Sequence, residues 1–260
     1  SQYVADIKVD NEGNVIVAGS FEGKVDFNKS ETEEAYLESK GRFDCFIAKY
    51  DSDGNYIWAK SFGGNEDDFL NCLTTDEFGN IYVGGSFKDT VDIGLNGSDL
   101  IIADIHTVSM FLAQFDSNGN YNWSNYSRTD FGGAITNDIS LDSENNVYIT
   151  GKFVGITNFD INGDATYSTG DHNFNAFLAK YNNDGNFIWL NHIESSYTSE
   201  GRAIINDLDN NVIVTGSFKQ ITNFDPQGDE SLNAMGHESF YLAKYNSDGE
   251  FIWVRVATGI

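Results

Sequence analysis

The chain has 260 residues, 40% hydrophobic and 14% aromatic, which is enough to bury a core as one domain. Its formal charge of −25 opposes non-specific binding to nucleic acid or to anionic membranes, because like charges repel. Its two cysteines, Cys45 and Cys72, are too few for a disulfide framework, and no apolar run approaches the ~20 residues that span a bilayer. We expect a soluble domain without a Cys45–Cys72 disulfide, and any targeting segment lies outside this sequence.

The segment up to Phe62 predicts four β-strands. Ala5–Val9 is a short strand, and the turn residues Asp10–Asn14 separate it from the almost continuously apolar strand Val15–Phe21. A long connection follows. Phe46–Tyr50 and Tyr56–Phe62 then flank an Asp-x-Asp-Gly-Asn turn, which predicts a hairpin.

This pattern recurs along the whole chain. The stretch FIAKYDSDGNYIW, ending at Trp58, returns three times at intervals of 64 to 66 residues. We expect the repeated tryptophans to pack in the core and the repeated glycines to allow close backbone approach in the middle of each sheet. These residues are Trp58, Trp123, Trp189 and Trp253, and Gly19, Gly85, Gly151 and Gly216.

Four antiparallel strands repeated at a fixed period predict an all-β chain with the β-propeller fold. We expect one domain of four blades, each with four antiparallel strands, and a monomer rather than a dimer. The alternative is that the chain is part of a larger propeller. The blades lie near residues 1–64, 65–130, 131–197 and 198–260.

The repeat resembles the bacterial SBBP-type β-propeller repeat family over essentially the whole chain. In the first copy the resemblance rests on Asp10, Gly13, Asn14, Gly19, Ser20, Phe21, Ala48, Lys49, Tyr50, Asp51, Gly54 and Trp58. Later copies depart from the pattern at Gln114, Asn145, Asn182, Asn210 and Asn246, and the asparagines preserve turn chemistry. The resemblance implies a secreted or cell-surface protein of bacterial type, with no common catalytic activity.

The acidic turn Asp51–Asn55 also suggests calcium. An EF-hand type of loop needs a distant bidentate glutamate, which is missing here. Asp and Asn side chains that bond their own backbone explain the turn without metal. We therefore expect no cofactor and keep calcium as the alternative.

The four repeats differ most in their long connections. These are residues 28–44, 94–109, 160–175 and 225–239, with the inter-blade segments 63–70, 127–136 and 194–201. Because strands alternate in direction, all of these segments emerge on one face, whereas the near-identical tight turns lie on the other. Long loops on a rigid scaffold commonly carry binding groups. The candidate ligand-binding residues are Tyr36, His106, Tyr167, His172, Tyr197 and His237.

A second candidate lies on the first strand of each repeat. Equivalent positions hold Asp6, Cys72, Asp138 and Ala203. Asp6 and Asp138 would point carboxylates toward the propeller axis, where a bound cation or water would have to offset their charge. The alternative is that each carboxylate is hydrogen-bonded within the protein.

No arrangement typical of a catalytic site is found in the sequence, so we do not expect an enzyme. We expect a non-catalytic module of a secreted or cell-surface protein that binds a glycan or a protein through the variable face. One alternative is a rigid structural spacer within a larger surface protein. A propeller hydrolase or lyase is the third, on fold analogy alone.

Overall fold

The computed structural model describes residues 1–30, 33–94, 97, 99–104, 106–170, 173–234 and 238–257. Every regular element in these residues is a β-strand, so the prediction of an all-β chain is confirmed. None of them belongs to a helix that is long and apolar enough to cross a membrane. Contacts group the chain into two compact units, Ser1–Tyr126 and Ser127–Ile260.

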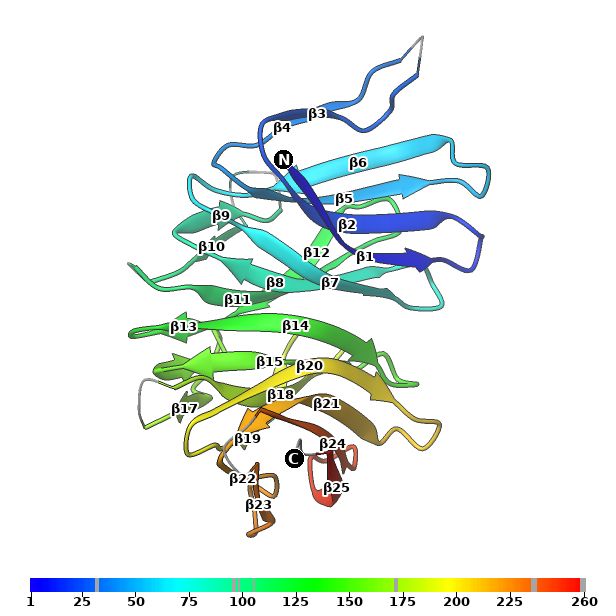
Figure 1. Ribbon diagram of the computed structural model, residues 1–260. Helices are drawn as coiled ribbons and strands as arrows, with labels where there is room; N and C mark the ends of the chain where they lie inside the picture. Colours follow the sequence, from blue (N-terminus) through cyan, green and yellow to red (C-terminus); the bar gives the residue numbers. More distant parts are fainter. Residues whose placement is uncertain are drawn as a thin grey trace. The chain divides into compact units, whose positions relative to one another are not determined.

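The first unit contains two four-stranded antiparallel sheets, each built from one repeat (Figure 1). The first sheet has the order β1 (Gln2–Val9), β2 (Val15–Phe21), β5 (Asp44–Tyr50) and β6 (Tyr56–Phe62). The second sheet has the order β7 (Phe69–Thr75), β8 (Ile81–Phe87), β11 (Ser109–Phe115) and β12 (Tyr121–Tyr126).

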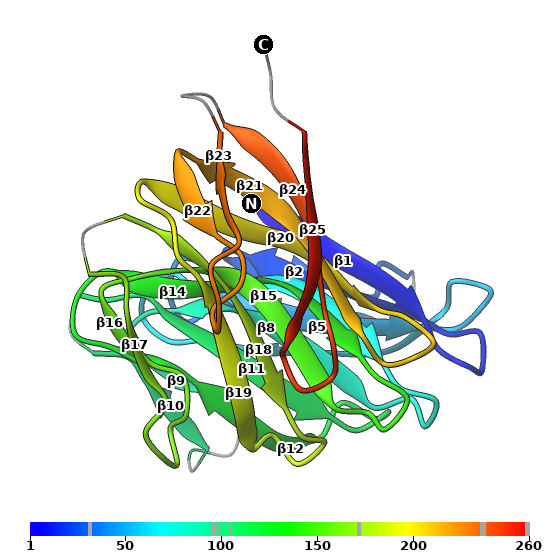
Figure 2. The same cartoon turned by 90° about the horizontal axis from the view of Figure 1, so that it is seen from below.

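The second unit repeats this plan. The third sheet has the order β14 (Gly133–Leu141), β15 (Val147–Val154), β18 (Asn175–Tyr181) and β19 (Phe187–Ile193). The fourth sheet has the order β20 (Thr198–Asn206), β21 (Val212–Lys219), β24 (Ser239–Tyr245) and β25 (Phe251–Ala257), with β25 at its edge in dark red (Figure 2).

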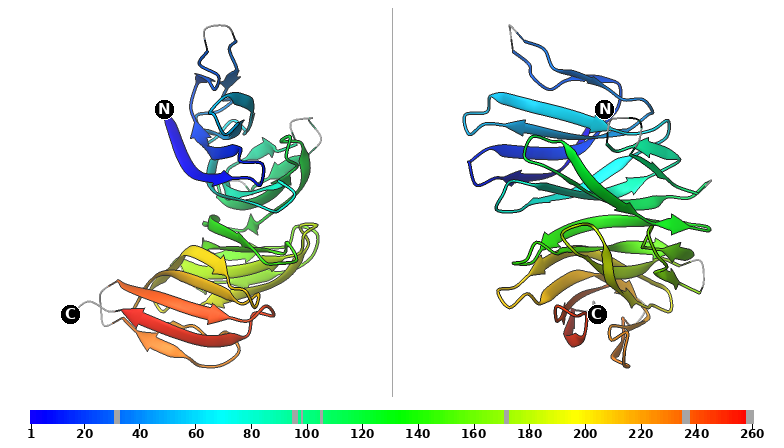
Figure 3. Two further views of the ribbon diagram at one scale, coloured as in Figure 1. Left: turned by 90° about the vertical axis from the view of Figure 1, so that its right-hand side faces the viewer. Right: turned by 180° about the vertical axis from the view of Figure 1, so that it is seen from behind.

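Between the second and third strands of each sheet lies a small hairpin that the sequence analysis did not predict. The hairpins pair β3 (Lys24–Asp26) with β4 (Tyr36–Glu38), β9 (Thr90–Asp92) with β10 (Leu100–Ile102), β16 (Ile156–Asn158) with β17 (Thr166–Ser168), and β22 (Ile221–Asn223) with β23 (Ser231–Asn233). In the second unit β13 (Arg128–Thr129) pairs with β16. The β3–β4 hairpin projects from the first sheet (Figure 3). Strands of three residues are too short to show a period of two, so their sequence signal is weak.

Side chains at the first position of the tight turns close these turns. In the first turn, Asp10 Oδ1 accepts hydrogen bonds from the amides of Glu12 and Asn14, both at 2.9 Å. The Asn182 and Asn246 side chains make the same contacts in the third and fourth sheets. Asn145 and Asn210 adopt φ values of 60° and 61°, which confirms that asparagine replaces the turn glycine by tolerating the left-handed region.

The repeated glycines lie beside a β-bulge in the first strand of each sheet. A Cβ atom on Gly19 would lie 1.9 Å from the Tyr3 carbonyl oxygen, so no other residue fits without a backbone shift. The same closeness, 1.9 to 2.0 Å, holds for Gly85, Gly151 and Gly216. The expectation of close backbone approach at these glycines is confirmed.

Each sheet has two faces, and within a unit the two sheets pack face to face. We call the face with Ile16, Ala18 and Ile47 the trailing face of the first sheet, and the face with Val83, Phe111 and Ala113 the leading face of the second; together they form the core of the first unit. In the second unit, the third sheet's trailing face packs on the fourth sheet's leading face in the same way. Cys45 and Cys72 are both buried, and no disulfide joins them.

Candidate functional site

The two ends of the sheets differ in each unit (Figure 1). At the turn end lie the tight turns, which have nearly the same hydrogen bonds in every repeat. At the hairpin end lie the small hairpins and the inter-sheet segments, where the repeats differ in sequence and length. The candidate ligand-binding residues belong to segments at the hairpin end.

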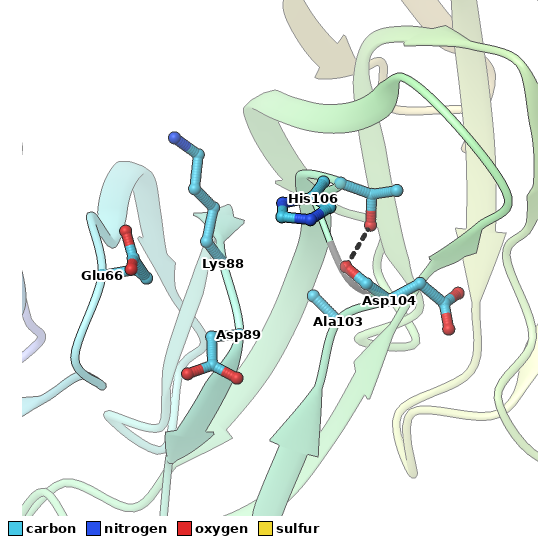
Figure 4. Close-up of a pocket in the computed structure, with 7 residues that line it drawn as sticks. Glu66, Lys88, Asp89, Ala103, Asp104 and His106 are labelled. Carbon is cyan, nitrogen blue, oxygen red and sulfur yellow. Dashed lines mark hydrogen bonds between the residues drawn. The ribbon is translucent and has the colours of Figure 1, made fainter.

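The first unit has a hollow of about 430 Å³ at its hairpin end (Figure 4). Its lining residues are Glu66, Lys88, Asp89, Ala103, Asp104, His106 and Thr107. In Figure 4 the His106 ring is turned toward the side of Lys88, whereas the Asp104 carboxylate points away from His106. The Asp104 carbonyl instead accepts a hydrogen bond from the Thr107 hydroxyl at 2.8 Å. Lys88 and His106 are therefore the side chains best placed to meet a ligand group that carries negative charge or accepts hydrogen bonds.

Two of the lining residues have left-handed backbone conformations. Asp89 has φ = 58°, and the same position before the small hairpin holds Gly23, Gly155 and Gln220, all with positive φ. This conformation is thus a feature of the repeat. His106 has φ = 67°, and it is exposed. A conformation of this kind in a residue other than glycine costs of order 1 kcal/mol, and such residues often occur at functional sites.

Asp68 contacts the backbone of one lining residue of the first hollow. Its carboxylate accepts hydrogen bonds from the amides of Gly64 at 2.7 Å and Lys88 at 3.2 Å, which joins the inter-sheet segment to a lining residue. Asp68 is fully buried, and this burial raises its pKa to about 7, with a further contribution from the nearby Asp44 and Asp67 carboxylates. Burial also raises the pKa of Asp44, against the hydrogen bonds from the Lys40 and Gly41 amides.

The sequence analysis missed Asp44 and Asp68. The only available signal was a difference between repeats, since the equivalent positions hold Asn175 on β18 and Ser199 on β20. In the second unit the Ser199 hydroxyl accepts from the Ala176 amide and donates to the Ile193 carbonyl, both at 2.8 Å. Of these two contacts between sheets, only the one between the first and second sheets has carboxylates at these positions.

The second unit has a hollow of about 420 Å³ at its hairpin end. Its lining residues are Thr169, Gly170, Glu194, Ser195, Ser196, Ile221, Asn223 and Ser231. The Ser195 hydroxyl donates to the Lys219 carbonyl and accepts from the Thr222 hydroxyl, both at 2.9 Å. In both units the hollow thus lies where the inter-sheet segment crosses the small hairpin of the following sheet. The second hollow presents mainly hydroxyl and amide groups, whereas the first presents charges.

The structure places four of the six candidate ligand-binding residues. His106 lines the first hollow, and Tyr197, which is 47% exposed, directly follows residues that line the second. Tyr36 lies on β4, where its hydroxyl donates to Glu34 at 3.1 Å. Tyr167 lies on β17, and its ring packs against Phe159. His172 and His237 lie outside the described residues.

Both candidate metal-binding aspartates have hydrogen-bond partners. The Asp6 carboxylate accepts from the Ile7 amide at 2.7 Å and from the Leu73 amide of β7 at 3.2 Å. The Asp138 carboxylate accepts from the amide of the next residue at 2.9 Å and from the Ile204 amide of β20 at 2.7 Å. Each carboxylate thus joins the first strands of two sheets. Across the part of the chain that the structure describes, no three His, Cys, Asp or Glu side chains are placed to hold a metal ion.

The Asp51–Asn55 turn uses its carboxylate oxygens internally. Asp51 Oδ1 accepts from the Asp53 amide at 2.9 Å and the Asn55 amide at 2.8 Å, and Oδ2 accepts from the Asn55 side chain at 2.8 Å. These bonds lower the pKa of Asp51, with the Asn55 side chain as the largest cause. The turn is therefore closed by its own groups, as an Asx turn is.

Comparison with known proteins finds a distant sequence relative. No family model matches the chain. It is 27% identical over 244 residues to an uncharacterised WD repeat-containing protein of Acanthamoeba polyphaga mimivirus; the match covers 82% of this chain and 18% of that protein. WD repeats form propeller blades, so this likeness agrees with a propeller-like repeat protein.

Several solved structures also align with the chain. The crystal structure of a protein of unknown function from Bacteroides caccae aligns over 82% of this chain and 90% of its own, with a TM-score of 0.29 and 10% sequence identity. A similarity at this level supports no fold assignment. The all-β repeat character therefore rests on the strand order and on the WD repeat-containing relative.

Proposed function

We propose that the chain is a non-catalytic β-propeller interaction module that binds a protein or a glycan through its hairpin end. The observation that carries this proposal is the contrast between the ends. At the turn end, side chains such as Asp10 and Asp51 close their own turns. At the hairpin end, each unit has a hollow at the same place in the repeat, and the two hollows differ in chemistry.

A scaffold that repeats its framework and varies one end is typical of binding modules. The first hollow offers Lys88 and His106, and the second offers hydroxyl and amide groups around Ser195 and Asn223. Tyr197 beside the second hollow adds an exposed aromatic ring, a group that often anchors partners at interfaces. The four sheets would be blades of a propeller. Following the SBBP resemblance, we further propose that the module is secreted or lies at the cell surface.

The experiment compares binding with the hairpin end changed and with the turn end changed. The double variant Lys88→Ala/His106→Ala removes the two side chains best placed to meet a ligand in the first hollow. Phe78→Ala is the matched control, because Phe78 is 70% exposed in a tight turn. Each protein is tested on a glycan array and as bait in a pull-down followed by mass spectrometry. We expect a partner of the wild type to be lost in the double variant and kept in the control. Equal binding by all three proteins would contradict the proposal for the first hollow.

The second candidate function is a rigid spacer within a larger protein. It is favoured by one observation: the chain spans about a fifth of the length of the curated relative that it matches. A spacer has no dedicated ligand. It would give neither a glycan signal nor an enriched protein with any of the three baits, whereas a binding module would give one with the wild type.

A further inference from the structure

We call the contact between the two sheets of a unit the joint, and it follows the same pattern in both units. In the first unit, Lys49 of the first sheet donates to the Ser117 carbonyl of the second sheet's hairpin turn at 3.2 Å, and the Trp58 ring lies against Gly119 of that turn. In the second unit, Lys180 donates to the Ser247 carbonyl at 3.1 Å, and the Trp189 ring lies against Gly249. In each unit, a lysine and a tryptophan on the trailing face of one sheet thus contact the hairpin turn of the next sheet.

The first sheet has the hairpin turn and the leading face that form one side of this joint. In the part of its unit that the structure describes, no other sheet packs on that face. Ser52 and Gly54 occupy the turn positions, and a Cβ atom on Gly54 would meet nothing within 4 Å. Its leading face has a groove of about 260 Å³ lined mainly by apolar side chains, among them Val4, Val17 and Phe46. Val4 is 68% exposed.

The equivalent leading faces elsewhere are covered. Val17 and Tyr50 are half-buried on the first sheet. Their counterparts on the second sheet, Val83 and Phe115, are at most 2% exposed, and those on the fourth sheet, Val214 and Tyr245, are fully buried. Because each of these covered faces packs on the trailing face of the sheet before it, the first sheet's leading face has the shape and chemistry to receive another trailing face.

The fourth sheet carries the donating half. Lys244 and Trp253 stand at the positions of Lys49 and Trp58. Phe240 on the same face is 49% exposed, whereas its counterparts Cys45 and Ala176 are fully buried. Apolar side chains exposed together on a sheet face commonly mark an interface.

We propose that the leading face of the first sheet docks the trailing face of the fourth sheet of a second copy of this chain. The contact repeats the joint of each unit: Lys244 donates to the Ser52 carbonyl, and the Trp253 ring packs on Gly54. Two such contacts close a symmetric pair of copies, because each copy supplies one half of each joint. The proposal predicts a dimer, whereas the sequence led us to expect a monomer.

The test measures molecular mass by light scattering across a concentration series. Gly54→Asn blocks the receiving face, since asparagine tolerates the left-handed conformation of Gly54 (φ = 83°) but places a side chain where the tryptophan ring must lie. Gly23→Asn is the matched control, because Gly23 has φ = 80° and nothing within 4 Å, and lies outside the joint. Phe240→Lys blocks the donating face. We expect a wild-type dimer, a dissociation constant raised more than about tenfold by either blocking variant, and no change with the control.

Mixing the two blocking variants tests whether the contact joins the leading face of one copy to the trailing face of the other. Gly54→Asn retains a working fourth sheet and Phe240→Lys retains a working first sheet, so the mixture forms one intact joint and recovers dimers that neither variant forms alone. A wild-type monomer at every concentration would overturn the proposal. So would a dimer that both blocking variants leave unchanged, or variants that do not complement each other.

Discussion

The indole ring of Trp58 lies against Gly119, so close that a Cβ atom on this glycine would be 3.0 Å from the ring carbons. Gly119 also has φ = 73°, a conformation that costs other residues 1–2 kcal/mol by order of magnitude. Two independent constraints, backbone conformation and contact with the neighbouring sheet, therefore act on one position. Both constraints favour glycine at position 119.

We expect Gly119→Ala to destabilise the protein by about 2–3 kcal/mol, from the left-handed backbone and from the displaced ring together. Gly23→Ala is the control, because it has the strain without the contact and should cost about 1 kcal/mol. Urea denaturation followed by tryptophan fluorescence measures both. Equal losses in the two variants would show that the Trp58 contact contributes nothing to stability.

The raised pKa of Asp68 predicts that the free energy of unfolding depends on pH. Because burial raises its folded-state pKa to about 7, the folded protein binds a proton that the unfolded chain, with a carboxyl pKa near 3.8, has already released. The contribution to stability is therefore full below about pH 4 and is lost as the pH rises to about 7, by up to about 4 kcal/mol. We expect Asp68→Asn to flatten the pH dependence of the unfolding free energy in this range.

Asp68→Ser provides the control for this effect, because the fourth sheet has Ser199 at the equivalent position. It also lacks the titrating carboxyl, so its pH profile should match that of Asp68→Asn even if the two variants differ in absolute stability. A wild-type slope that persists in both variants would assign the pH dependence to other carboxyls.

Lys49 forms a buried ion pair with Asp10, with 2.9 Å between Nζ and Oδ2. Burial acts to raise the pKa of Asp10, but the hydrogen bonds from Lys49 and Asn14 outweigh it and lower the pKa to about 2. Lys49→Gln should cost about 3 kcal/mol at neutral pH, because it leaves a buried carboxylate without its cation. The loss should shrink as the pH falls toward 2, where the carboxylate takes up a proton in the wild type as well.

The second sheet shows how a glutamine is tolerated at this position. Gln114 donates to the Tyr82 hydroxyl at 2.7 Å, and this hydroxyl donates to the Asp76 carboxylate at 3.2 Å. Ile16 stands at the position of Tyr82 in the first sheet. Adding Ile16→Tyr to Lys49→Gln should therefore recover part of the lost stability, as measured by a double-mutant cycle. Strictly additive losses would argue against this hydrogen-bond relay.

The left-handed backbone of His106 lowers stability, whereas its side chain is proposed to serve binding, so one substitution should change the two in opposite directions. Replacing it with glycine removes the strain of φ = 67°, so His106→Gly should stabilise the protein by about 0.5–1 kcal/mol. If His106 serves the first hollow, the same variant binds the partner found in the pull-down more weakly. Gln220→Gly, with φ = 61°, is the control for strain relief without a change in the hollow. A loss of stability in His106→Gly would show that its side chain supports the fold.

Signals that lie close together in the sequence predicted much of the fold. The turn at Asp10, the strand before Phe21 and the glycine at Gly19 each follow from a few neighbouring residues, and fourfold repetition strengthened them. The small hairpins escaped prediction because three-residue strands such as Lys24–Asp26 show no periodicity. Their loops are held by side-chain contacts, such as the Asp26 carboxylate accepting from the Ala35 amide at 2.9 Å.

The candidate site was predictable only as a region. Sequence reasoning placed His106 and Tyr197 in variable segments, and the structure places them in or beside hollows. The hollows themselves arise where an inter-sheet segment crosses a hairpin, which joins residues such as Glu66 and His106 that are far apart in the chain. Asp68 could not be foreseen, since nothing in its local sequence shows that it bonds the Lys88 amide.

The tight turns that close on their own side chains have a consequence for how the chain acquires its structure. The turns at Asp10, Asp51 and their counterparts are closed by backbone and side-chain hydrogen bonds between residues at most four positions apart, so each turn can form without a distant residue. Closing such a short turn costs little loop-closure entropy. A ribosome that releases this protein one repeat at a time thus exposes segments that can already begin to order, before the sheet that will cover them has been synthesised.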